Sequence, residues 1–162
     1  MQLGMSLETF TLVHVLISLL GIAAGFGVLF GLLNSIASGT WTALFLATTV
    51  LTSVTGFMFP FAGFLPSHGV ASISVVLLVI ALFALYGRRL AGPWRLVYVV
   101  TALLALYLNV FVLIVQMFLR LPALHTLAPN GSETAFAVTQ GLVLLIFVAL
   151  IIAAARSRPV PA

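Results

Sequence analysis

The sequence predicts an all-α integral membrane protein, a bundle of five transmembrane helices with its N-terminus outside and its C-terminus in the cytoplasm. Three observations predict this fold: the composition, one long uncharged stretch, and the placement of the arginines. Of the 162 residues, 64% are hydrophobic and 5% are charged, whereas a soluble domain has about 45–50% apolar and about 25% charged residues. Because so few polar side chains cannot cover a water-exposed surface, we expect lipid to solvate the chain.

An uncharged stretch of 79 residues, from 9 to 87, contains no Asp, Glu, Lys or Arg. A helix needs about 20 apolar residues to cross the hydrocarbon core, so this stretch must contain several helices. Polar residues at 34–40 and the prolines Pro60 and Pro66 interrupt it. These breaks predict three spans, at residues 9–33, 41–59 and 68–87.

Two further spans follow a short basic turn. The fourth is predicted at residues 94–119 and ends at Arg120, and the fifth is predicted at residues 133–155 after a polar connection. Ser67 is the predicted N-cap of the third span, because Pro66 prevents the second helix from continuing. Transmembrane β-strands would alternate apolar and polar residues, and apolar runs such as residues 75–80 do not alternate. The five spans therefore form a single polytopic domain over residues 1–162.

The six basic residues are all arginine, and they predict the orientation. With five spans, the turn after the third span and the C-terminal tail lie on the same side. That side carries five arginines and the other carries only Arg120. The positive-inside rule then places the tail in the cytoplasm. Residues 1–10 lack the basic region of a cleaved signal peptide, so we expect the first span to be retained.

The composition also bears on location and partners. The absence of lysine and cysteine, together with abundant alanine, valine and leucine, favours a bacterial protein, and we expect a multi-pass protein of the cytoplasmic (inner) membrane. The arginines are scattered at the ends of apolar runs, which predicts no nucleic-acid partner. The expected partners are the lipid bilayer and either other membrane subunits or further copies of the chain.

Small residues follow one face of the first span. Gly21 and Gly25, and likewise Gly27 and Gly31, match the small-xxx-small pattern that lets two helices approach closely. His14 lies on the stripe of Gly21 and Gly25. We therefore expect the four glycines to pack against a neighbouring helix.

Uncharged polar residues are expected to face the interior of the bundle. Asn109 and Gln116 share one face of the fourth span, and Gln140 lies near the start of the fifth. An amide that faces lipid is costly, so these three should bond a neighbouring helix or a ligand. The second span has a similar face of short polar residues, whose hydroxyls should mostly bond their own helix. That face contains Thr49, Thr52, Ser53 and Gly56.

The three histidines are the main candidates for a cofactor site. His14, His68 and His125 are all predicted at the outer side of the membrane. Two imidazoles at matching depth, His14 and His68, could bind a b-type haem, and all three could bind zinc or copper. Their spacing matches no metal motif. The alternative is that His68 and His125 are interfacial and that His14 is a buried polar group bonded to a neighbouring helix.

Catalytic and transport motifs are missing from the sequence. His14 is the only acid or base inside a span, and no phosphate loop, nucleophile elbow or HExxH pair occurs. We therefore expect a non-catalytic subunit, assembly factor or partner-binding module rather than an enzyme. Two alternatives remain: an electron-transfer subunit with haem or metal at its outer side, and a small-solute carrier or channel formed by an oligomer.

Overall fold

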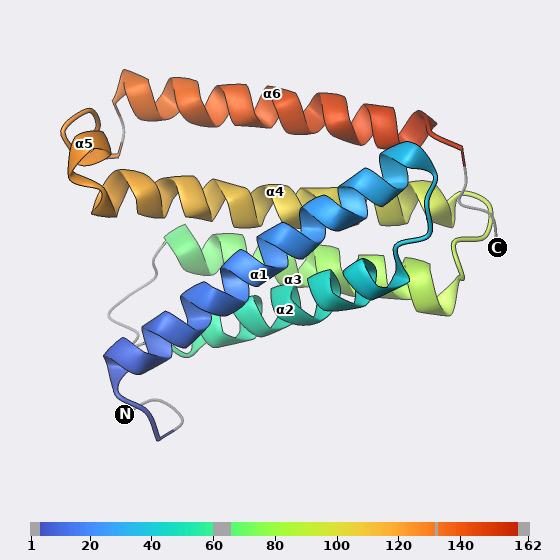
Figure 1. Cartoon of the computed structure of the whole chain (residues 1–162), viewed down its shortest axis with the longest axis horizontal. Helices are drawn as coiled ribbons and strands as arrows, with labels where there is room; N and C mark the ends of the chain where they lie inside the picture. Colours follow the sequence, from blue (N-terminus) through green and yellow to red (C-terminus); the bar gives the residue numbers. More distant parts are fainter. Residues whose placement is uncertain (1–3, 60–65, 132, 159–162) are drawn as a thin grey trace.

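The computed structural model describes residues 4–59, 66–131 and 133–158, with backbone alone for 66–68. Its elements are helical, and no β-strand occurs in these three segments. In chain order they are α1 (Leu7–Asn34), α2 (Gly39–Phe57), α3 (Pro66–Leu82), the π-helical turn η1 (Phe83–Gly87), α4 (Trp94–Arg120), α5 (Pro122–His125) and α6 (Thr134–Arg156). Figure 1 shows the long helices packed as a bundle, with α1 crossing the others obliquely and the short helix α5 at the left end.

The five predicted spans are confirmed as helices. Each helical boundary lies within a few residues of the predicted one, and all five helices are long and apolar enough to cross a membrane. Large apolar side chains remain exposed around the bundle. Leu145 and Ile146 of α6 are 66% and 56% exposed, and Val79 of α3 is 60% exposed. Such a surface is typical of a multi-pass membrane protein.

Local signals at the helix ends explain most boundaries. Ser6 caps α1, since its hydroxyl oxygen accepts the N–H of Thr9 at 3.2 Å. Ser35 ends α1 in the left-handed region, with φ of 56°, and donates its N–H to the carbonyl of Gly31. The prediction of Ser67 as the cap of α3 was wrong, because the helix already begins at Pro66. Proline fits a first helical position, where its fixed φ suits the helix and no N–H is needed.

Two elements were not predicted from the sequence. The helix α5 lies in the connection after α4 and begins at Pro122. The turn η1 ends α3, where the N–H of Arg88 donates to the carbonyl of Phe83, five residues earlier, at 2.9 Å. Both depend on how neighbouring residues pack, which hydropathy does not record.

The four glycines of α1 contact the segments packed against that helix. A Cβ atom added at Gly25 would lie 2.5 Å from Cδ1 of Leu106 and 3.0 Å from the ring of Phe45. Added Cβ atoms at Gly21, Gly27 and Gly31 would lie 2.9 Å from Thr48, 2.7 Å from Trp41 and 2.8 Å from Ser38, respectively. Only hydrogen fits at these positions, so the glycines let α2 and α4 approach α1 closely.

The hydrophobic core fills one half of the bundle. α4 is central and packs against α1, α3 and α6, and most of its buried residues lie in its N-terminal half. The core cluster comes from the halves of the helices nearest the α1–α2 and α3–α4 connections. Its members include Ala24, Val28, Phe45, Leu78, Ala81, Val99, Ala102, Leu106, Phe147 and Ala154. The other half, where α1 begins and α4 ends, contains a cavity instead.

Candidate ligand-binding cavity

The cavity has a volume of about 660 Å³ and lies between α1, α2, α3 and α4. Its lining is mainly apolar, with a minority of polar side chains contributed by all four helices. The polar lining residues are Thr11, His14, Ser18, Thr52, Ser53, Ser74, Asn109, Gln116 and Arg120. Mainly apolar cavities of this size, with a few polar groups, are typical of small-molecule sites.

His14 is held against α2. Its Nδ1 lies 2.7 Å from Oγ1 of Thr55, and its ring meets the ring of Phe59 edge to face at 5.1 Å between centroids. The Thr55 hydroxyl also lies 2.7 Å from the carbonyl of Leu51, so its single proton serves either that carbonyl or Nδ1 of His14.

Two hydroxyl groups of the lining, those of Ser18 and Ser53, bond their own helices. Ser18 donates to the carbonyl of His14 at 2.7 Å, and Ser53 donates to the carbonyl of Thr49 at 2.9 Å. Ser74 of α3 lies 3.4 Å from Ser53, which joins α2 to α3. Because these hydroxyls are already bonded within the protein, the inner part of the cavity favours an apolar occupant.

The two predicted polar residues of α4 occupy different depths. Asn109 lies at the inner end of the cavity, and its Nδ2 donates to Oγ1 of Thr49 at 3.2 Å. Gln116 is exposed and lies two turns closer to the end of α4, where its Oε1 accepts Nε of Arg120 at 3.1 Å. Asn109 therefore links two helices, whereas Gln116 positions an arginine at the cavity rim.

Gln140 lies outside the cavity lining and joins α6 to α4. It is 8% exposed, and its Nε2 donates to the carbonyl of Phe111 at 3.1 Å. Its Oε1 is buried and has no hydrogen-bond partner among the described residues. This bond helps to hold α6, which packs almost only on α4, against the bundle.

The structure separates His14 from His125 by element and by surroundings. His125 lies in α5, outside the cavity lining, and His68 lies in the first turn of α3, with its side chain outside the described residues. No group of three metal-ligating residues occurs within the described segments. The haem site at His14 and His68 and the three-histidine metal site therefore stay predictions.

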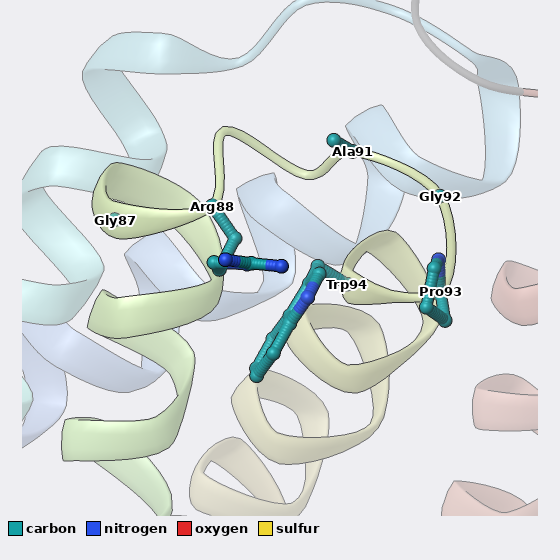
Figure 2. A pocket seen from close by; sticks show the side chains of 6 residues that line it. All are labelled: Gly87, Arg88, Ala91, Gly92, Pro93 and Trp94. Carbon is teal, nitrogen blue, oxygen red and sulfur yellow. The ribbon is translucent and has the colours of Figure 1, made fainter.

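A second, shallower hollow lies at the opposite end of the bundle, in the turn between η1 and α4. It is lined by residues 87, 88 and 91–94 and has a volume of about 430 Å³. Figure 2 shows the guanidinium of Arg88 beside the Trp94 ring, and the distance from Cζ to the ring centroid is 5.1 Å. This cation–π contact occupies the one charged group of the lining, which leaves the larger cavity as the better candidate site.

Sequence reasoning did not single out several residues at or beside the cavity, among them Thr55, Ser74 and Arg120. Thr55 holds His14, Ser74 contributes from α3, and Arg120 lies at the rim. Thr55 and Ser74 carry no distinctive sequence signal. Arg120 carries a distinctive sequence signal, because it is the single arginine predicted on its side of the membrane.

No family model, curated protein or solved structure matches the chain. The proposed function rests on the cavity and its residues.

Proposed function

We propose that the protein is a non-catalytic, multi-pass protein of the bacterial inner membrane that binds a small amphiphilic ligand in the cavity between α1 and α4. One observation carries this proposal. Polar side chains from four helices converge on a mainly apolar cavity in one half of the bundle, whereas the hydrophobic core fills the other half. A packing defect of this size is costly to retain without an occupant, because its lining loses van der Waals contacts.

The chemistry of the lining supports binding rather than catalysis. His14 is the only group of the lining suited to act as a general base, and Thr55, whose hydroxyl bonds it, does not line the cavity. Ser18 donates to a main-chain carbonyl rather than to the imidazole. A nucleophile activated by a base needs the hydroxyl to donate to that base. This lining has no such pair.

The carrier or channel alternative has less support. A transport path would have to continue through the bundle beyond Asn109, and the residues beyond it are the packed core. Phe45 and Leu106 there are 1% and 0% exposed. A binding site that is closed at its inner end fits the arrangement better than a continuous path. Assembly with other membrane subunits, or as a homo-oligomer, stays a prediction.

The ligand should co-purify with the protein. We expect mass spectrometry of protein extracted in native lipid to detect one enriched amphiphile, and this ligand should be lost in Gly56→Leu. An added Cβ at Gly56 meets only Cε1 of His14 at 3.8 Å, so leucine should enter the cavity without a clash at its base. Gly141→Leu is the matched control, since nothing lies within 4 Å of its added Cβ.

Two results would contradict the proposal. One is an unchanged lipid profile in Gly56→Leu, with a melting temperature equal to that of the native chain. The other is a Soret band of stoichiometric intensity in the visible spectrum, which would favour the electron-transfer alternative.

The proposed orientation can be tested by labelling. The chain contains no cysteine, so a single cysteine at Ser6 gives an unambiguous signal. We expect it to react with a membrane-impermeant thiol reagent in intact cells, and a reporter fused after Ala162 should be active in the cytoplasm. Labelling only after permeabilisation would reverse the orientation.

A further inference from the structure

Among the described residues that line the cavity, Arg120 at the rim is the one that carries a full charge. Arg120 lies in the last turn of α4, is exposed, and uses Nε to bond Gln116. Its two Nη atoms make no hydrogen bond, and its guanidinium forms no ion pair, with any of the described residues. A guanidinium presents paired N–H donors that suit a carboxylate or a phosphate. The rim therefore offers an unused anion-binding group.

The inner part of the cavity suits a hydrocarbon chain. Most of its lining is apolar, the hydroxyls of Ser18 and Ser53 donate to main-chain carbonyls, and Nδ2 of Asn109 donates to Thr49. Asn109 and Arg120 lie eleven residues apart on α4, which is about 16 Å at 1.5 Å per residue. Half of the hydrocarbon core of a bilayer is about 15 Å thick. The cavity is therefore as deep as one lipid tail is long.

We propose that the ligand of this cavity is a single-chain amphiphile with an anionic headgroup, such as a fatty-acid carboxylate. The inference rests on the proposed function, and adds the class of ligand. The headgroup pairs with Arg120 at the rim, and the chain runs along α4 toward Asn109. Gln116 is a positioning residue, since its bond to Nε of Arg120 leaves both Nη atoms available to the headgroup.

Charge and shape together favour this class over other occupants. A cationic headgroup would be repelled by Arg120, and a neutral headgroup would leave the guanidinium unpaired. A carboxylate and a lipid phosphate share the chemistry that Arg120 recognises. An experiment must therefore distinguish a fatty acid from a phospholipid as the ligand. We assign the single-chain acid because the lining carries one charged group and the cavity is about one lipid tail deep.

Native mass spectrometry of the full-length protein with laurate, dodecanol and phosphatidylglycerol tests the assignment. We expect one laurate per chain, bound about fivefold more tightly than dodecanol, because Arg120 is exposed and water screens its ion pair with the headgroup. Arg120→Gln should remove this preference while dodecanol still binds. Arg156→Gln is the matched control: it removes the same charge from the last turn of α6, at the opposite end of the bundle. It should leave the preference intact.

The outcomes separate this inference from the proposed function. Equal binding of laurate and dodecanol, both lost in Gly56→Leu, would overturn the anionic headgroup and leave the binding cavity standing. Phosphatidylglycerol that displaces laurate in an Arg120-dependent way would overturn the single-chain assignment. If neither laurate nor dodecanol binds, or if Gly56→Leu does not weaken their binding, both proposals are wrong.

Discussion

Gly25→Leu should lower the stability of the protein more than any other single change on α1. The new side chain would enter the space of Leu106 and Phe45, which are 0% and 1% exposed and have no room to move outward. Forcing extra carbon atoms into a packed core costs about 1–3 kcal/mol, and more where helix backbones must separate. We expect the melting temperature in detergent to fall by about 5–10 °C.

Gly141→Leu provides the comparison, because this glycine of α6 has open space around it. The substitution is the same, and replacing glycine with leucine improves helix propensity at both positions. Its melting temperature should therefore be equal to or above that of the native chain. Equal stability of the two variants would contradict the close approach of α1 to α2 and α4.

Arg95→Met should loosen the C-terminal end of α6. Two Nη atoms of Arg95 lie 3.0–3.4 Å from four main-chain carbonyls and 3.0 Å from the hydroxyl of Ser157, and their N–H groups are shared among these acceptors. The carbonyls belong to Ala154, Ala155, Ser157 and Arg158. The last carbonyls of a helix have no partner within it, so an arginine there both satisfies them and complements the helix dipole. Removing the donors should cost about 1–3 kcal/mol.

Arg95→Met should also destabilise the C-terminal end of α1. The Ser157 hydroxyl donates to the carbonyl of Leu32 at 2.7 Å, and the hydroxyl of Ser35 donates to the carbonyl of Arg158 at 2.9 Å. Hydrogen exchange should therefore increase both at the end of α6 and at the end of α1. Methionine keeps the length and apolar stem of arginine, so the change isolates the hydrogen bonds.

Arg89→Met is the matched control for charge. Arg89 lies in the connection just before α4, is exposed, and makes no side-chain hydrogen bond with the described residues. Both variants remove one arginine from the same end of the bundle, so an effect on membrane orientation would appear in both. A melting temperature that falls equally in the two variants would mean that the network of Arg95 contributes nothing to stability.

The sequence alone determined the number and the limits of the long helices. Hydropathy over about 20 residues is a local property, and the breaks at 34–40 and at Pro60 need no knowledge of packing. The sequence also identified Gly25 as a packing position, because only a small residue repeated every four positions permits close helix contact. Asn109 was expected to face a neighbour for a similar reason, since no amide is well solvated by lipid.

The tertiary structure alone decided which neighbours these residues meet. Asn109 meets Thr49 at the inner end of a cavity, whereas Gln140 meets the carbonyl of Phe111 outside it. Arg95 and Arg89 look alike in the sequence, and only the fold gives the first a network of carbonyls. In a helix of a soluble protein, the spacing of apolar residues distinguishes the buried face from the solvent-exposed face. Here lipid and core are equally apolar, so the sequence does not record which face of each helix lies inside.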